Sequence, residues 1–425
     1  MYRIPSLPES EGSSEIAPKV AVLDTVHGAG LIAERMRERG ADAAAFEVYH
    51  HVPDLSGFDL VVAPVHLPPG NPAHQVAIRL GKRPITHHQA VGYLLAGTGD
   101  FRAFEVTGTR GKTTTALILA QVLSARGTVA SHTTRGIEVW RDGKREVVTS
   151  GLSIAPANVI RAWEAAEEVG ATNLVSEVSL GGTGLADFGI LTSFAEDYRI
   201  AGETLWASTA KLQMVSLAKP GFELIAGEDV RISADFTFGP GPRGQVWSTE
   251  RKILAGGETA RLRLGDGLDL RSYAPAIAGA TAAALAAGLD LEEIASALEG
   301  FEGLGGRMKV VREGGILFVD NSNSGLRVGG VEAALDSADG GGRLALVVGE
   351  EAATVCEGMD VPALINLLVR RRREVDLLIL VGERLAPYAS GLSAETAPDL
   401  EAGLAGAKAA LERGDRLVSC VKCFR

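Results

Sequence analysis

Thr107-Gly-Thr-Arg-Gly-Lys-Thr-Thr-Thr115 is the stretch that decides the fold of the central part of this chain. It follows an alternating apolar run, 101–106, that predicts a strand, and it opens an apolar run, 116–123, that predicts a helix. A glycine-rich turn between a strand and a helix N-terminus forms a phosphate cradle, because backbone N–H groups and the helix dipole face the anion. Lys112 can reach the β- and γ-phosphates of a nucleotide, and the Thr113 hydroxyl can bind Mg²⁺.

One position departs from the general phosphate-loop pattern, which would place glycine where this chain has Val106. The strand before the loop and the helix after it still favour a phosphate loop over a chance Lys-Thr pair in an ordinary turn. The residues expected to hold the nucleotide are Thr107, Gly108, Thr109, Arg110, Gly111, Lys112, Thr113 and Thr114.

Length, charge and cysteine content limit the class of protein. The 425 residues are too many for one core and predict two or three domains. The net charge of −11 argues against broad nucleic-acid binding, and no apolar run is long enough to predict a signal peptide or a membrane span. Cys356, Cys420 and Cys423 do not make a disulfide framework, which favours a reducing, cytoplasmic compartment. The single pair Cys420-x-x-Cys423 predicts two buried or terminal thiols rather than a metal site.

Alternating strand and helix patterns predict an α/β protein with parallel sheets. We expect a flexible tail at 1–18, a doubly wound, Rossmann-like domain at 19–100, a central P-loop ATPase domain at 101–304 and a C-terminal α/β domain at 305–425. The predicted strands in the two outer domains are 19–24, 58–63, 84–88 (a strand end), 315–320, 344–348 and 376–381, and an Ala-rich helix is predicted at 276–288.

The loop at 107–115 resembles the nucleotide loop of the Mur ligase family, in which Gly-Thr-x-Gly-Lys-Thr-Thr is characteristic. The resemblance extends over most of the chain and keeps the family's order of N-terminal, central ATPase and C-terminal domains. It implies the three-domain Mur ligase architecture, and a cytoplasmic ligase that uses ATP and Mg²⁺. Lys112, Glu177, Lys211 and Arg307 are the catalytic residues that it implies.

Four positions bear on the metal that the resemblance implies. Glu177, at the end of a predicted strand, resembles the family's Mg²⁺-binding glutamate, although a solvated strand-end glutamate is the alternative. Lys211 resembles the family's carbamylated lysine, and the alternative is a lysine on the surface of a helix. Tyr198, after Asp197, stands where many members carry a histidine that helps to hold a second Mg²⁺, so the second metal site stays open, as does a plain loop role for Asp197.

Elements of the C-terminal domain are implied to contact the nucleotide. Arg307 resembles the family's Gly-Arg element, which reaches the ATP phosphates, and a structural linker arginine is the alternative. Asp320 begins a loop that contacts nucleotide in the family, and Asn323 stands where many members carry histidine; a simple Asx turn is the alternative. Members commonly carry an asparagine that faces adenine near the start of the Ala-rich helix, and 274–281 contains none.

Seven of the eight histidines lie in the first 88 residues. Strand ends face the ligand cleft in α/β sheets, and histidines there supply N–H donors and titratable charge for a large anionic ligand. Scattered loop histidines are the alternative. The predicted substrate-binding residues are His27, His51, His66, His87 and His88.

The N-terminal domain and the ending 414–425 resemble most the branch of the Mur ligase family that closes the last carbocyclic ring of a nickel tetrapyrrole. This resemblance implies that ATP activates one carboxylate of an anionic nickel tetrapyrrole as an acyl phosphate. A ring carbon of the same molecule then attacks it, and ADP and phosphate are released. Two alternatives stay open: an amide-forming ligase, which would need an amine, and a nucleotide-dependent binding protein, which would make no bond.

Overall fold

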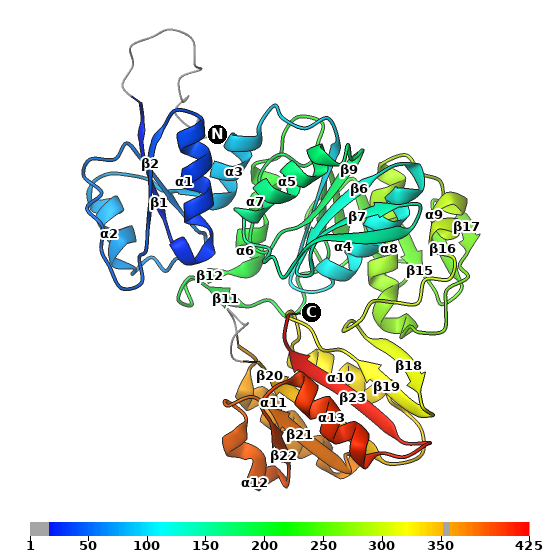
Figure 1. Cartoon of the computed structure of the whole chain (residues 1–425). Helices are drawn as coiled ribbons and strands as arrows, with labels where there is room; N and C mark the ends of the chain where they lie inside the picture. The colour runs from blue at the N-terminus through cyan, green and yellow to red at the C-terminus, as the bar shows by residue number, and fades with distance from the viewer. Residues whose placement is uncertain (1–16, 352–357, 425) are drawn as a thin grey trace. The chain divides into compact units, whose positions relative to one another are not determined.

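The computed structural model describes residues 17–351 and 358–424 (Figure 1). Nearly all of the tail predicted at 1–18 therefore lies outside the described residues, as does Cys356. The chain forms two compact units. The first runs to Trp247 and includes Ala276–Asp290, and the second consists of Ser248–Pro275 and the chain from Leu291 onward. The domain boundaries placed at 100 and 304 stay predictions.

The first unit begins with a four-stranded parallel sheet in the order β2-β1-β3-β4. Its elements are β1 (Lys19–Leu23), α1 (Ala29–Glu38), β2 (Asp42–Phe46), β3 (Leu60–Ala63), α2 (Pro72–Arg79), β4 (Ile85–Thr86) and α3 (His87–Leu95). Alternate residues of β1 face opposite sides of the sheet. Val20 and Val22 pack with residues of α1 and α3, whereas Ala21 and Leu23 pack with residues of α2. Burial on both faces explains the continuous apolar run of this strand.

The strand end predicted at 84–88 is wrong in its second half. His87 and His88 open α3 instead. The Thr86 hydroxyl accepts the Gln89 backbone N–H, and the Gln89 side chain accepts the Thr86 backbone N–H, so the two residues form a capping box. Two donors at the helix start are satisfied in this way, which fixes the beginning of the helix at His87.

A second sheet of the first unit carries the phosphate loop, with strands in the order β15-β14-β13-β10-β5-β9-β6-β7-β8. Seven neighbouring strands of this order, β15, β14, β13, β10, β5, β9 and β6, run parallel. The pairs β6–β7 and β7–β8 are antiparallel. The strands of this part are β5 (Arg102–Thr107), β6 (Val129–Thr133), β7 (Gly136–Arg141), β8 (Lys144–Ser150), β9 (Asn173–Glu177), β10 (Phe188–Leu191), β11 (Arg199–Ile200), β12 (Leu205–Trp206), β13 (Glu223–Gly227), β14 (Phe236–Gly239) and β15 (Val246–Ser248), and the helices are α4 (Lys112–Leu123), α5 (Asn158–Glu168), α6 (Ala207–Lys211) and α7 (Gln213–Ser216). β5 lies between β9 and β10, so the loop that follows β5 starts from the middle of the sheet.

The second unit contains a six-stranded sheet in the order β18-β19-β23-β20-β21-β22, parallel except for the β18–β19 pair. Its elements are β16 (Lys252–Ala255), β17 (Glu258–Arg261), α9 (Leu291–Ala297), β18 (Lys309–Glu313), β19 (Ile316–Asp320), α10 (Val328–Ser337), β20 (Leu344–Glu350), α11 (Val361–Arg371), β21 (Leu377–Val381), α12 (Ala389–Leu392), β22 (Glu395–Ala397), α13 (Leu400–Ala410) and β23 (Arg416–Lys422). The parallel sheets of both units confirm the predicted α/β class. Cys420 and Cys423 are buried free thiols, also as predicted.

The Ala-rich helix α8 (Leu270–Ala286) begins six residues before the predicted start at Ala276 and contains Pro275. Proline removes a helix hydrogen bond and usually marks a boundary. Here tertiary contacts hold the preceding turn, because Tyr273 is 1% exposed, its hydroxyl accepts the Leu304 N–H at 2.7 Å, and its ring packs edge-on against Phe301. Local propensity is overridden by packing at this point.

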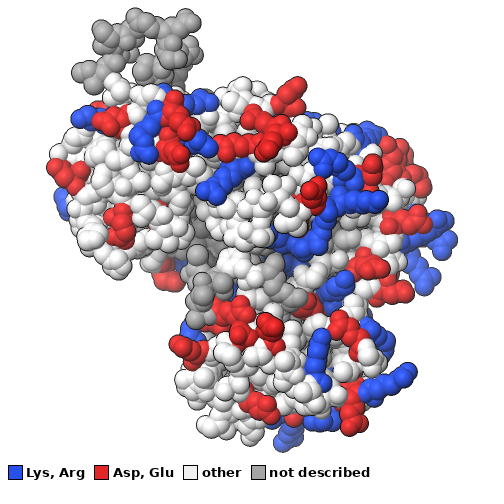
Figure 2. All heavy atoms as spheres, in the orientation of Figure 1, with Lys and Arg blue, Asp and Glu red and all other residues white. Residues whose placement is uncertain are grey.

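Acidic and basic side chains are intermixed over the face shown in Figure 2. Within 17–351 and 358–424, no helix combines the length and the apolar character that crossing a bilayer requires.

Candidate active site

The phosphate loop is a rigid turn between β5 and α4. Gly108 has φ 145°, and a Cβ there would lie 2.1 Å from Thr192 Oγ1. Gly111 has φ 79°, which favours glycine, and it directly precedes α4. The Thr192 hydroxyl lies within hydrogen-bonding distance of the backbone carbonyls of Thr107 (3.0 Å) and Arg110 (2.6 Å). The loop is therefore held open at the N-terminus of a twelve-residue helix, where backbone N–H groups favour an anion.

Three of the predicted residues meet beside this loop. The Thr113 hydroxyl donates to Glu177 Oε2 at 2.7 Å, and Lys112 Nζ lies 3.9 Å from Glu177 Oε1. Glu177 ends β9, the neighbour of β5, and is only 2% exposed, so it is not a solvated strand-end residue. A buried carboxylate and a hydroxyl are the oxygen ligands that Mg²⁺ prefers, and the ammonium group beside them suits a phosphate. The residues present therefore fit a magnesium nucleotide.

Lys211 is fully buried at the end of α6 and is not a surface lysine. Its Nζ donates to the Ser179 carbonyl, and the Thr107 hydroxyl donates to the same carbonyl at 3.4 Å. Its ammonium lies 5.8 Å from the centre of the Tyr198 ring. This shared carbonyl places Lys211 next to the first residue of the phosphate loop.

The neighbouring Asp197 has a local structural role. Its carboxylate accepts the backbone N–H of Ser208 at 3.0 Å and the Ser208 hydroxyl at 2.5 Å, and so holds the start of α6. Of the other loop residues, Arg110 forms an exposed ion pair with Glu196 at 3.2 Å, and Thr114 is half-buried on α4.

The predicted residues of the second unit form a cluster of their own. Arg307 Nη1 donates to Asn323 Oδ1 at 3.2 Å, and Asn323 Nδ2 donates to the Gly306 carbonyl at 2.8 Å. The Gly306 N–H donates to Asp320 Oδ2 at 3.0 Å. A Cβ at Gly306 would lie 2.2 Å from the Ser322 carbonyl oxygen, so glycine is needed before Arg307. The Gly-Arg element and the loop after β19 therefore hold each other in place.

A histidine cluster lies at the carboxyl end of β1. His27 Nδ1 is 2.6 Å and His66 Nε2 is 3.4 Å from Asp24 Oδ2, and the two rings pack edge-on with centroids 4.5 Å apart. The Tyr49 hydroxyl donates to the same oxygen at 2.9 Å. Burial alone would raise the pKa of Asp24, but these hydrogen bonds outweigh burial and hold the pKa well below its usual value.

His87 and His88 are buried near this cluster, and His66 acts on the pKa of both. His87 is fully buried and shares a hydrogen bond of 2.9 Å with the Leu23 carbonyl, and burial lowers its pKa to about 4. His88 is 2% exposed, and burial lowers its pKa to about 3, with further lowering from His87, His66 and Lys211. Both rings are therefore neutral at pH 7. His51 lies apart on an exposed loop.

Asp24 and Tyr49 were not among the site residues predicted from the sequence. Asp24 comes directly after a buried strand, where an aspartate faces the ligand edge of a parallel sheet, so its position was a usable signal. Tyr49 lies 25 residues away, and no local pattern connects it with Asp24.

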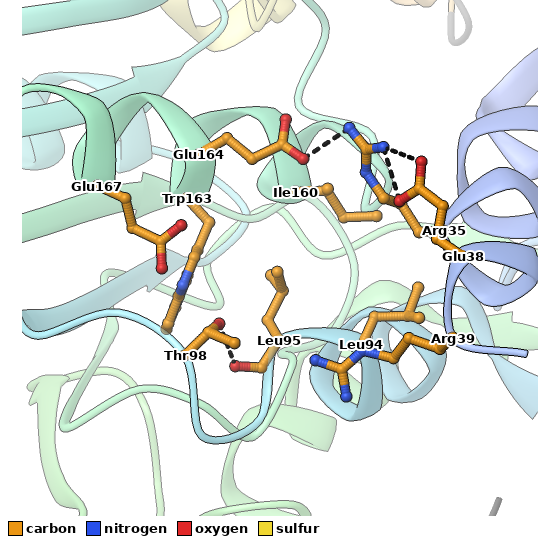
Figure 3. Close-up of a pocket in the computed structure, with 10 residues that line it drawn as sticks. All are labelled: Arg35, Glu38, Arg39, Leu94, Leu95, Thr98, Ile160, Trp163, Glu164 and Glu167. Atoms are coloured by element: carbon orange, nitrogen blue, oxygen red, sulfur yellow. Dashed lines mark hydrogen bonds and ion pairs between the residues drawn. The ribbon is translucent and has the colours of Figure 1, made fainter. Parts of the chain in front are cut away.

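A cavity of about 280 Å³ lies away from these clusters, between α1, the end of α3 and α5 (Figure 3). None of its lining residues is a predicted site residue. The Arg35 guanidinium at its rim forms ion pairs of 2.7 Å with both Glu38 and Glu164, and so joins α1 to α5. The cavity lies where α1 and α3 of the first sheet meet α5 of the second.

Comparison with known proteins shows which family this chain resembles. Residues 310–423 match the family model described as coenzyme F430 synthetase CfbE, C-terminal domain. The coenzyme F(430) synthetase of Methanosarcina acetivorans is 34% identical over an alignment that covers 96% of this chain and 99% of that protein.

Solved structures show the fold alone, at low identity. MurF from Acinetobacter baumannii has a TM-score of 0.56 at 16% identity and covers 79% of this chain and 78% of its own. The folylpolyglutamate synthase/dihydrofolate synthase of Yersinia pestis, complexed with AMPPNP and Mn, has a TM-score of 0.60 at 17% identity and covers 79% of this chain and 90% of its own. Both agree with the Mur ligase architecture predicted from the phosphate loop. The curated relative, aligned over nearly the whole of both chains, shows that this protein belongs to the coenzyme F430 synthetase family.

Proposed function

We propose that this enzyme is an ATP-dependent ligase that closes a carbocyclic ring of the nickel seco-tetrapyrrole precursor of coenzyme F430, with release of ADP and phosphate. The observation that carries the proposal is the meeting of Lys112, Thr113 and Glu177 beside the loop at the N-terminus of α4. The substrate class comes from the relative named coenzyme F(430) synthetase.

The chemistry follows from the poor reactivity of a carboxylate, whose leaving group would be oxide. Transfer of the ATP γ-phosphoryl group to the carboxylate gives an acyl phosphate with a good leaving group. The loop N–H groups and Lys112 hold the phosphates and spread the negative charge, and Arg307 is proposed to add positive charge. A bound Mg²⁺, held by Thr113 and Glu177, would supply Lewis-acid neutralisation of the same charge. Because the attacking carbon belongs to the same molecule, proximity replaces a second substrate site.

The substrate is proposed to lie at the carboxyl edge of β1. His27 and His66 are half-buried there, so their rings can contact a ligand, and His51 lies on an exposed loop of the same domain. His87 and His88 are buried and neutral, so we propose that they shape the wall behind the ligand rather than add charge. A carboxylate of the tetrapyrrole would be recognised by an imidazole N–H donor of the exposed His51.

The proposal is tested by anaerobic incubation of the enzyme with ATP, Mg²⁺ and the nickel seco-tetrapyrrole, followed by visible spectroscopy and mass spectrometry. We expect a product lighter by one water, formed in equal amount with ADP and without any amine. A requirement for an amine would indicate instead that the enzyme forms an amide bond. If the protein binds ATP but releases no phosphate in response to substrate, it is a nucleotide-dependent binding protein and not a ligase.

Replacing Lys211 by alanine is expected to abolish activity, and added formate or acetate is expected to restore part of it. We propose that Lys211 carries a carbamate, which supplies an anionic oxygen near the phosphate loop that a short carboxylate can replace. Enzyme equilibrated with ¹³C-bicarbonate should show a carbamate signal in ¹³C NMR that Lys211→Ala lacks.

The matched control is Lys219→Ala, which removes a half-exposed lysine that forms an ion pair with Asp187 at 2.6 Å. This variant should keep its activity and the carbamate signal. Full activity of Lys211→Ala without added carboxylate would count against the carbamate.

A further inference from the structure

Asp24 holds the His27 ring in one orientation. Asp24 is fully buried, and its two carboxylate oxygens accept hydrogen bonds from different groups. Oδ1 accepts the backbone N–H groups of Val26 at 3.1 Å and His27 at 3.3 Å, and Oδ2 accepts the Tyr49 hydroxyl at 2.9 Å. The carboxylate therefore cannot rotate without losing several hydrogen bonds, and it presents Oδ2 to His27 Nδ1 at 2.6 Å. A separation of 2.6 Å is typical of a charge-assisted hydrogen bond.

This arrangement decides the tautomer of His27. An ionised aspartate accepts a hydrogen bond from the nitrogen that faces it, so Nδ1 carries the hydrogen and Nε2 becomes the basic nitrogen. His66 is a weaker candidate for the same role, because its Nε2 is 3.4 Å from Asp24, farther than His27 Nδ1 at 2.6 Å. The His27 side chain is 25% exposed, so a ligand at the sheet edge can reach it and a proton can leave to solvent.

The surroundings of His27 connect it with the phosphate loop inside the first unit. A Cβ at Gly28 would lie 2.4 Å from Ala157 Cβ, so the turn that carries His27 packs closely against the residue before α5. A Cβ at Gly181 would lie 2.9 Å from His88 Nδ1, and two residues earlier the Ser179 carbonyl binds Lys211 and Thr107. His88 and the first residue of the phosphate loop therefore border the same segment, 179–181.

We propose that His27, positioned by Asp24, is the general base that takes up the proton lost by the attacking carbon as the ring closes. The inference rests on the proposed function, because it needs a carbon nucleophile. The electron pair of the C–H bond is used to form the new C–C bond, and the proton goes to His27 Nε2. The bond between the acyl carbon and the phosphate oxygen breaks, and phosphate leaves with the electron pair of that C–O bond. Glu177 accepts the Thr113 hydroxyl beside the phosphate loop, so its carboxylate is already engaged there.

The test separates activation of the carboxylate from ring closure. His27→Ala and wild-type enzyme are compared in single turnovers with ATP, Mg²⁺ and the nickel seco-tetrapyrrole, with hydroxylamine present to trap acyl phosphate as hydroxamate. The substrate is saturating, so that weaker binding by His27→Ala does not limit either step; under this condition we expect His27→Ala to form ADP and hydroxamate at a rate close to that of wild type, and to close the ring roughly 10²–10⁴-fold more slowly. Added imidazole should restore part of the ring closure, because it can replace the missing base.

Asp24→Asn is expected to show the same split, with ADP and hydroxamate kept and ring closure slowed, because Asp24 is a positioning residue that acts through His27. The matched control is His50→Ala, which removes an exposed histidine one residue from Tyr49 and should change neither step.

Two results would overturn the base assignment: ring closure at the normal rate in His27→Ala, or equal loss of hydroxamate and ring product without rescue by imidazole. Failure of the proposed function would look different, because wild-type enzyme would then form no ADP with this substrate.

Discussion

Replacing Lys112 by alanine is expected to lower ATP-dependent product formation by at least roughly 10²–10³-fold, the usual cost of losing one preorganised donor at a charge that develops in the transition state. Lys112 is the first residue of α4, and its ammonium lies 3.9 Å from the buried Glu177. Phosphoryl transfer depends almost wholly on positioning and on neutralisation of charge, so no other residue is expected to replace it. ADP release and product mass measure the effect.

The matched control for this change is Lys144→Ala, which removes an exposed lysine from the edge strand β8 of the same sheet. It should retain wild-type activity. Circular dichroism should show that Lys112→Ala keeps its fold, since the lysine side chain is 17% exposed and lies outside the apolar core. Near-normal turnover by folded Lys112→Ala would mean that the loop at 107–115 does not bind the reacting phosphates.

Replacing Glu177 by glutamine is expected to raise the Mg²⁺ concentration needed for half-maximal activity by at least about 10–100-fold, the range found for loss of even an outer-shell partner. Glutamine keeps the shape of the side chain and can still accept the Thr113 hydroxyl through its single amide oxygen, but it removes the charge that a hard cation prefers. A titration of activity against Mg²⁺ at saturating ATP measures the shift.

Glu146→Gln is the control for Glu177→Gln. Glu146 is an exposed carboxylate on β8, 3.8 Å from Arg141, and its neutralisation should leave the magnesium titration unchanged. If the magnesium titration is also unchanged in Glu177→Gln, Glu177 is not a ligand of the metal, in spite of its place beside Thr113.

The phosphate loop could be predicted because its requirements are local. Strand, glycine turn and helix follow one another within about twenty residues, and Gly108 and Gly111 are required by backbone conformation and close approach. Glu177 could be predicted for a related reason, since it ends a strand and the carboxyl ends of neighbouring parallel strands lie together.

The features that could not be predicted depend on partners distant in the sequence. Lys211 is buried with its Nζ against a carbonyl 32 positions earlier, and no pattern around Lys211 reveals that partner. β23 lies between β19 and β20 in the six-stranded sheet of the second unit, although it comes last in the chain and its apolar run is interrupted by Ser419. Tyr49 and Asp24 meet only after the first sheet has formed. The capping box at Thr86, in contrast, was a local signal that the strand pattern concealed.

The central claim is that ATP activates the substrate carboxylate as an acyl phosphate, and oxygen transfer tests it most directly. The nickel seco-tetrapyrrole is labelled with ¹⁸O in the reacting carboxylate, and ring closure is run with unlabelled ATP and water. The account predicts ADP rather than AMP, phosphate carrying ¹⁸O from the carboxylate in equal amount with cyclised product, and no need for an amine. Formation of AMP and pyrophosphate, or retention of all the ¹⁸O in the product, would contradict it.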